Sequence, residues 1–224
     1  MKTKIYIIIA LSCVVLAGVD GIIARDFPWY LVLLAGFFYS LSLYKRQERQ
    51  KTELVVDEDK LALEQMFTSF VAFVGKDALE DHLGGYFAKV ELLPKCHVFH
   101  PMISIGNISS DKQPKYRYLA YEKPSRLFTN LPEGHLSTYE SRDTKFIFPQ
   151  NNQPWGKWGG AILINDFTIY AFSGFPELLD EAFVCWVAWH RKELDTDRFK
   201  VICERRANNP FLQKIYTAAC SKQI

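Results

Sequence analysis

The stretch GGAILINDFTIYAFSGFPELLDEAF, residues 159–183, decides the fold of this chain. Two runs rich in β-branched and aromatic residues, 161–164 and 167–172, meet at a two-residue connection, as in a β-hairpin. Pro176 fits the first position of a helix, and the acids after it suit the positive end of a helix dipole. The stretch therefore predicts a hairpin followed by a helix that continues to about Leu194.

The remainder of the body reads as a mixture of helices and strands without internal repeats. Apolar spacing and turn residues predict helices over 57–75, 77–89 (weakened at Gly84-Gly85) and 210–219, and strands over 96–108, 116–121 and 145–148. This order favours an α+β domain, in which one antiparallel sheet is flanked by helices.

The N-terminal fifty residues predict two transmembrane helices. Residues 5–24 and 27–44 are apolar runs of 20 and 18 residues. At about 1.5 Å per residue such helices span about 30 and 27 Å, which matches a bilayer core. Only Arg25 and Asp26 separate them, so we expect a tight hairpin over residues 1–50 and a soluble α+β domain over 51–224. A cleaved signal peptide is the alternative.

The distribution of charge predicts a location and excludes one class of partner. Basic residues precede the first apolar run and follow the second, which places both termini in the cytoplasm of a cell with the hairpin in its inner (plasma) membrane. Five scattered cysteines fit a reducing compartment. The body holds 21 basic and 22 acidic residues beyond residue 50, which argues against nucleic acid as a partner and leaves the lipid bilayer.

The segment KCHVFHP, residues 95–101, contains three residues that can bind a metal, Cys96, His97 and His100, but predicts no metal site. On a strand Cys96 and His100 share a face about 13 Å apart, because each residue advances about 3.3 Å. His97 then points to the opposite face. Only a bend together with ligands such as His82 or His135 would build a site here.

The corner SGFPELLDEAF, residues 173–183, is a weak candidate for an anion site. Glu177, Asp180 and Glu181 place carboxylates where a bound phosphate would lie. We interpret these acids as solvated groups in the first turns of a helix. Because no nucleophile, base and acid converge in a recognisable signature elsewhere, the sequence does not predict an enzyme.

The run AFVCWVAW, residues 182–189, is apolar on every side of its predicted helix. Such a helix is buried on two sides, in the core or against a partner. We expect it to enter the core and to form part of an interface through Phe183, Trp186 and Trp189.

The order of elements over 159–183 resembles the C-terminal half of the GlcG/HbpS-like haem-binding family. The residues that carry the resemblance are Gly159, Gly160, Ser173, Gly174, Asp180, Glu181 and Ala182, and AYEKPSRLFTN at 120–130 is similar to a helix of that family. The chain departs from the family at Pro124, where the family carries alanine.

The resemblance implies a PAS/profilin-like fold, with a five-stranded antiparallel sheet and flanking helices, that binds a tetrapyrrole or another small molecule. By residue type it offers His97, His100 and His135 as candidate haem ligands, with Ser173 and Gly174 near the ligand. Two classes of function follow. The first is a membrane-anchored binding or sensory module for a small ligand or haem. The second is a subunit of an inner-membrane complex, such as a secretion or conjugation apparatus, that contacts a protein partner or forms a homo-oligomer.

Overall fold

The computed structural model describes residues 29–94, 96–149 and 152–221. The chain divides into two compact units, Met1–Glu58 and Asp59–Ile224. Helix α2 (Trp29–Val74) supplies the described part of the first unit and continues into the second. The second unit carries the sheet, its covering helices and every site considered below.

The predicted transmembrane hairpin is corrected by the structure. Among the described residues, no helix combines the length and the apolar composition needed to cross a membrane. Within α2 the described apolar run covers only residues 29–44 before Lys45 and Arg46 follow. These are all but the first two residues of the predicted span 27–44. The other predicted span, 5–24, lies outside the described residues, and the location of the protein stays a prediction.

A five-stranded antiparallel sheet confirms the α+β prediction. Its order is β2 (Cys96–Phe99), β1 (Gly84–Leu93), β7 (Thr168–Ser173) and β6 (Ala161–Asn165), and β3 (Ile103–Gly106) pairs with the other half of β1. The β6–β7 hairpin is the one predicted from residues 161–172. A separate two-stranded sheet joins β4 (Ile147–Phe148) to β5 (Gln153–Pro154).

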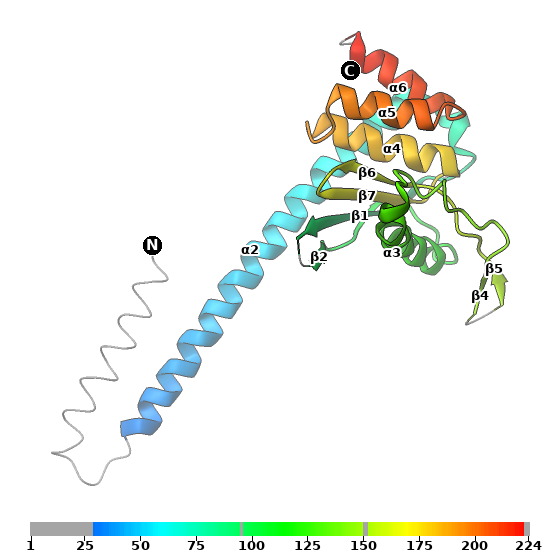
Figure 1. The fold of residues 1–224 in the computed structure, drawn as a ribbon. Helices are drawn as coiled ribbons and strands as arrows, with labels where there is room; N and C mark the ends of the chain where they lie inside the picture. Colours follow the sequence, from blue (N-terminus) through cyan, green and yellow to red (C-terminus); the bar gives the residue numbers. More distant parts are fainter. Residues whose placement is uncertain (1–28, 95, 150–151, 222–224) are drawn as a thin grey trace. The chain divides into compact units, whose positions relative to one another are not determined.

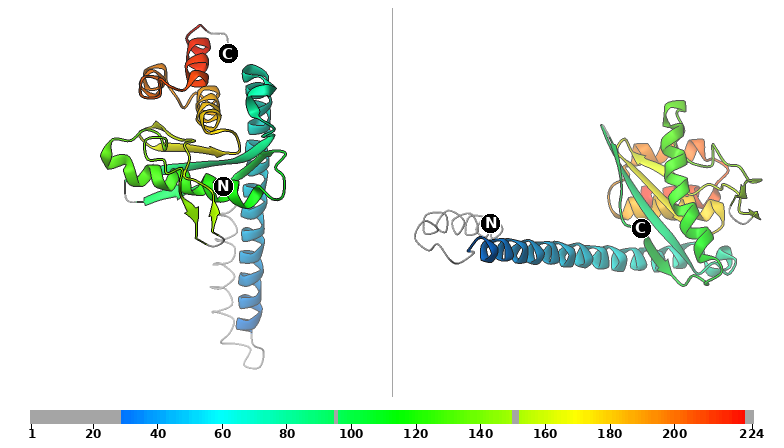
Figure 2. Two further views of the ribbon diagram at one scale, coloured as in Figure 1. Left: turned by 90° about the vertical axis from the view of Figure 1, so that its right-hand side faces the viewer. Right: turned by 90° about the horizontal axis from the view of Figure 1, so that it is seen from below.

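Both faces of the sheet are covered, because both sets of alternating side chains are apolar. Phe172 points to one core cluster and its neighbour Ala171 to the other, as the period of a strand requires. Helix α3 (Gln113–Asn130) covers the Ala171 face. Helices α4 (Glu177–His190), α5 (Thr196–Arg205) and α6 (Pro210–Cys220) cover the Phe172 face. Figures 1 and 2 show the strands between these two layers of helices.

The apolar helix α4 packs inside the molecule, against the end of α2. Phe183 is fully buried and Trp186 is 3% exposed. The ring centroid of Phe70 in α2 lies 5.2 Å from that of Phe183 and 5.9 Å from that of Trp186. The half-buried Trp189 lies 6.0 Å from Phe199 of α5. The predicted interface residues therefore form intramolecular contacts, and their contact with a partner stays a prediction.

The predicted helix over 77–89 is wrong. A short 3-10 helix, Lys76–Leu79, is followed by β1, which begins at the glycine pair. A Cβ atom on Gly85 would lie 2.4 Å from the carbonyl oxygen of Ser173, so the glycine permits β1 and β7 to approach. The glycine pair, interpreted as a weak point in a helix, thus marks a close contact between strands.

The predicted strand over 116–121 is also wrong, because this segment lies in α3. The alternation of YRYLAY covers only six residues, whereas the burial pattern of α3 is helical. Its buried residues are Tyr116, Leu119, Ala120, Lys123, Pro124 and Leu127. This spacing of three and four continues through the proline, which removes one backbone donor without ending the helix. The predicted tail helix is confirmed as α6, while α5 was not predicted.

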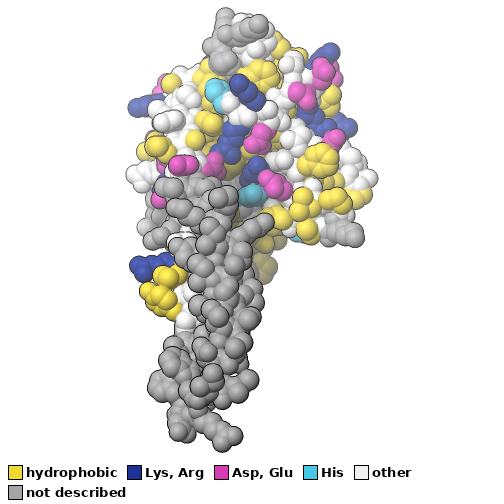
Figure 3. All heavy atoms as spheres, turned by 90° about the vertical axis from the view of Figure 1, so that its left-hand side faces the viewer, with side chains coloured by type: hydrophobic (Ala, Val, Ile, Leu, Met, Phe, Trp, Pro, Cys, Tyr) yellow, Lys and Arg dark blue, Asp and Glu magenta, His cyan; other side chains and the backbone are white. Residues whose placement is uncertain are grey.

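The surface of the described residues is mixed in charge on the face that Figure 3 presents. Lysine and arginine side chains lie between aspartate, glutamate and hydrophobic side chains there, rather than gathered into a patch of one sign. This distribution agrees with the near balance of charge in the sequence beyond residue 50.

Candidate functional site

The acids of the opening corner are buried, contrary to the interpretation of solvated groups. Asp180 is 2% exposed and Glu181 is fully buried. Being adjacent on α4, these two residues, here called the acidic pair, point about 100° apart around the helix axis. Each therefore binds a cation from a different part of the chain.

Asp180 pairs with Lys123 of α3, whose side chain is 1% exposed. The Lys123 Nζ lies 2.7 Å from Asp180 Oδ2 and also donates to the carbonyl oxygen of Phe172 at 2.8 Å. Gly160 leaves space for this pair, since a Cβ atom there would lie 2.7 Å from Lys123 Nζ and from Asp180 Cβ. Its φ of +118° is also a conformation that favours glycine.

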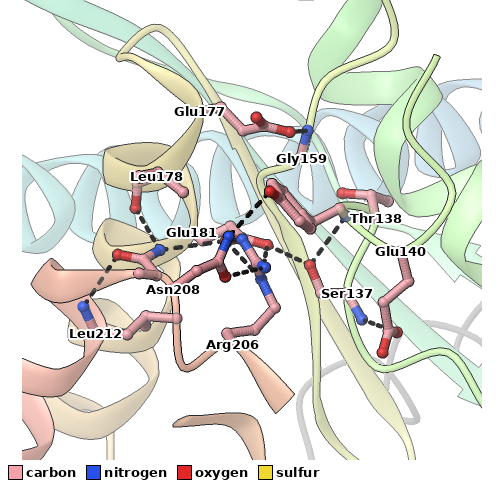
Figure 4. A network of polar contacts seen from close by, with 12 residues as sticks. Ser137, Thr138, Glu140, Gly159, Glu177, Leu178, Glu181, Arg206, Asn208 and Leu212 are labelled. Atoms are coloured by element: carbon pink, nitrogen blue, oxygen red, sulfur yellow. Dashed lines mark hydrogen bonds and ion pairs between the residues drawn. The ribbon is translucent and has the colours of Figure 1, made fainter. Parts of the chain in front are cut away.

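Glu181 pairs with Arg206, which follows α5 (Figure 4). The Arg206 Nη2 donates to Glu181 Oε2 at 2.7 Å, and its Nε donates to both carboxylate oxygens. Ser137 donates a short hydrogen bond to the same carboxylate, and the guanidinium lies 3.4 Å from the ring centroid of Tyr139. The acceptor positions of the Glu181 carboxylate are occupied, and solvent does not reach it. The network therefore connects the loop that follows α3 with helices α4 and α5.

The Asp180 carboxylate also positions a histidine. Its Oδ1 accepts hydrogen bonds from the backbone N–H groups of Gly174 at 3.2 Å and Phe175 at 2.8 Å. The carbonyl oxygen of Gly174 in turn lies 2.6 Å from His82 Nδ1, and the Tyr116 hydroxyl lies 2.8 Å from the same nitrogen. The buried ion pair is thereby linked through Gly174 to an imidazole nearer the surface.

The contacts of His82 determine its tautomer. A carbonyl oxygen only accepts, so Nδ1 carries the proton and donates it to Gly174. A protonated Nδ1 cannot accept from Tyr116, whose own hydrogen therefore points elsewhere. Burial, followed by the charges of Asp180 and Asp111, raises the pKa of Tyr116 to about 12, so the phenol stays protonated. In the neutral ring, His82 Nε2 then presents a lone pair, as in sites where a carbonyl fixes the other ring nitrogen.

His82 and Tyr116 line a small hollow of about 140 Å³, here called the His82 hollow. Its other lining residues are Asp81, Leu83, Gly84, Asn107, Ile108, Ser109 and Lys112. Glu80 and Asp81, beside the histidine, have φ values of 48° and 64°, in the left-handed region. Residues in this conformation cost energy and persist only where the surrounding structure holds them. They are found most often at ligand sites and active sites.

The candidate haem ligands do not come together. His97 is exposed on β2, with its ring 4.6 Å from that of Phe128. His100 Nε2 lies 3.2 Å from Glu91 Oε1, and His135 Nε2 lies 3.7 Å from Glu133 Oε2. None of the three lines the His82 hollow, which is also far smaller than a tetrapyrrole requires. Among the described residues no group of three or more His, Cys, Asp and Glu is arranged to hold a metal ion, and neither the separated histidines nor the His82 hollow fits a haem.

The other two predicted ligand residues differ in their surroundings. Ser173 is 2% exposed and pairs with Tyr86 in the sheet. Gly174 belongs to the link described above, between Asp180 and His82. The sequence therefore placed one predicted residue beside the hollow. It named His82 only as an auxiliary metal ligand and missed Tyr116, which it assigned to a strand.

Asp180 makes stability depend on pH. Burial raises the pKa of Asp180 from 3.8 to about 7, and the Lys123 ammonium and two backbone N–H groups limit the rise. Because the folded state binds this proton more tightly, its contribution to the free energy of unfolding is full below about pH 4 and is lost as pH rises through about 7. The expected slope reaches about 1.4 kcal/mol per pH unit.

Urea unfolding between pH 4 and 8 measures this dependence. The slope is expected to disappear in Asp180→Asn and to remain in Asp197→Asn, which alters an exposed acid of α5. An unchanged slope in Asp180→Asn would assign the dependence to other groups.

The comparisons with known proteins add no family to this description. No protein-family model, no curated protein and no solved structure matches the chain. The resemblance to the GlcG/HbpS-like family stays a prediction, and the function of the chain has to be argued from the geometry of its own residues.

Proposed function

We propose that the domain is a binding module that takes a small polar ligand in the His82 hollow. The observation that carries the proposal is the fixed imidazole, whose Nδ1 is committed to Gly174 while the ring lines an open hollow. A binding site of this kind is concave and presents a few oriented polar groups. Here Tyr116, Asn107 and Ser109 supply such groups beside the histidine.

The ion pair of Asp180 and Lys123 gives this site a rigid support. Asp180 holds the backbone of Gly174 from one side, and Lys123 holds Asp180 and the end of β7 from the other. Because these groups are buried and mutually bonded, the carbonyl that orients His82 is fixed before any ligand arrives. Preorganisation of this kind lowers the entropy that binding costs.

Ligand-observed NMR on the full-length chain tests the proposal, with glycine, acetate, methylammonium and acetamide as probes. We expect at least one probe to bind, and His82→Ala and Tyr116→Phe each to weaken it at least about tenfold, through loss of an oriented hydrogen bond. His97→Ala, which alters an exposed histidine of β2, is the matched control and should bind as before. Absence of binding by all four probes, or binding that survives both variants, contradicts the proposal.

A specific observation also favours a second candidate function, self-assembly through the outer edge of β2. Leu92 lies opposite His97 in the register, yet Leu92 N–H donates to the carbonyl of Phe167 on the β7 side. His97 therefore does not exchange backbone hydrogen bonds with β1. By the alternation of an antiparallel ladder, the backbone groups of His97 and Phe99 point outward from the sheet.

A second copy of this chain fits that edge. With Val98 opposite Val98 of the second copy, His97 and Phe99 form two reciprocal backbone pairs, and like faces of the two sheets coincide. Residues 96–99 carry no acidic or basic side chain other than the histidine, so no like charges oppose each other. The exposed rings of Tyr121 and Phe128, which pack on Phe99 and His97, would extend the contact.

The variant His97→Pro should prevent this assembly without disturbing the fold. The change removes an N–H group that points outward, so the β1–β2 ladder keeps its bonds. We expect sedimentation of the full-length chain to show a dimer for the wild type and for His97→Ala, and a monomer for His97→Pro. A monomeric wild type, or a His97→Pro dimer of equal strength, contradicts self-assembly through β2.

A further inference from the structure

We infer that the His82 hollow selects a small zwitterion, a molecule with both an ammonium and a carboxylate group, of the size of a simple amino acid. This inference rests on the proposed function and names its ligand class. It follows from the polarity of the lining groups and from the size of the hollow.

The two rings present opposite hydrogen-bonding roles. In the neutral ring His82 Nε2 accepts, because Nδ1 holds the proton that it donates to Gly174. The Tyr116 hydroxyl donates, because the protonated Nδ1 cannot receive its hydrogen. The rings lie close together, with centroids 6.1 Å apart. A ligand that satisfies both must therefore offer an N–H or O–H donor near the imidazole and an acceptor near the phenol.

The charged lining residues are likewise of two opposite kinds. One acid, Asp81, and one base, Lys112, are among the lining residues, while Asn107 and Ser109 are neutral. A simple anion would meet the Asp81 charge, and a simple cation would meet that of Lys112. A molecule that carries both charges can place its ammonium near Asp81 and its carboxylate near Lys112, so that attraction outweighs repulsion.

The volume limits how much of a ligand the hollow can enclose. The hollow measures about 140 Å³, and an engineered cavity of about 150 Å³ in another protein holds benzene. A ligand of about five to seven non-hydrogen atoms fits this space. Glycine and alanine lie within this range, whereas a nucleotide or a tetrapyrrole lies far outside it.

Titration calorimetry of the full-length chain with glycine, acetate and methylammonium tests the ligand class. Glycine is expected to bind at least about tenfold more tightly than either single-charge probe, because only glycine engages both charged residues. Asp81→Asn should weaken glycine and methylammonium but spare acetate. Lys112→Gln should weaken glycine and acetate but spare methylammonium. Arg117→Gln, an exposed cation elsewhere on α3, should leave all three unchanged.

The possible results distinguish a failure of the zwitterion inference from a failure of the binding module. If acetate or methylammonium binds as tightly as glycine, with dependence on His82, the zwitterion inference is wrong and the binding module stands. If glycine binds best but is insensitive to both charge variants, the assignment of the charged contacts is overturned. If none of these three probes binds, the zwitterion inference is wrong, and the binding module is also wrong if acetamide fails to bind.

Discussion

Replacing Lys123 with methionine is expected to lower the free energy of unfolding by about 3–5 kcal/mol at pH 8. The substitution removes the ammonium 2.7 Å from Asp180 and leaves that carboxylate buried without a cation. The carboxyl then either stays charged in an apolar setting or takes up a proton, and both are costly at high pH. The loss should shrink toward pH 5, where protonation costs less. Urea unfolding at the two pH values measures both effects.

Two further variants show that the pair is the cause. Arg117→Met removes an exposed cation from the same helix and should change stability by less than about 0.5 kcal/mol. Lys123→Met combined with Asp180→Asn should lose less than the sum of the single changes, because no unpaired charge remains. An additive double variant would mean that Lys123 and Asp180 stabilise the fold independently.

Arg206→Met is the second change with a large expected effect, again about 3–5 kcal/mol. Glu181 is fully buried and would lose two charge-assisted hydrogen-bonding groups at once. The ring of Tyr139 would also lose the guanidinium that lies over it. Thermal and chemical denaturation of the full-length chain measure the loss.

The control uses the geometry of the Arg206 guanidinium, which donates hydrogen bonds through both Nε and Nη2 to Glu181. Arg206→Lys keeps the charge but cannot donate two parallel hydrogen bonds, so its loss should lie between those of the wild type and Arg206→Met. Lys200→Met removes an exposed cation of α5, 3.9 Å from Glu204, and should cost less than about 0.5 kcal/mol. Equal losses for the lysine and methionine variants would show that the bidentate contact, rather than the charge, is what matters.

The parts of the fold that the sequence predicted are those specified by local signals. The β6–β7 hairpin follows from two apolar runs around a two-residue turn, and α6 follows from the apolar spacing after Pro210. The structure adds that Asn209 caps α6, because its side-chain oxygen accepts from the N–H groups of Phe211 and Leu212. The mistaken elements lie where a local signal has two meanings. A glycine pair marks both weak helices and close strands, and six alternating residues of α3 mask a longer helical period.

The candidate site was beyond prediction because its contacts are distant in the sequence. Asp180 and Lys123 are 57 residues apart, and Glu181 and Arg206 are 25 apart. Adjacent acids at the start of a helix are ordinarily solvated, and only the packed structure shows that α3 and the end of α5 bring cations to them. The orientation of His82 likewise depends on Gly174, a backbone group that carries no side-chain signal at all.

The tautomer of His82 is the most direct test of the central claim, that a fixed imidazole forms a ligand site. Long-range ¹H–¹⁵N spectra of the histidine rings in the full-length chain distinguish protonated from unprotonated nitrogens. The structure predicts a protonated Nδ1 and an unprotonated Nε2, and a shift of the Nε2 signal when glycine is added. A protonated Nε2 with an unprotonated Nδ1, or an Nε2 signal that glycine leaves unchanged at saturation, would contradict the claim.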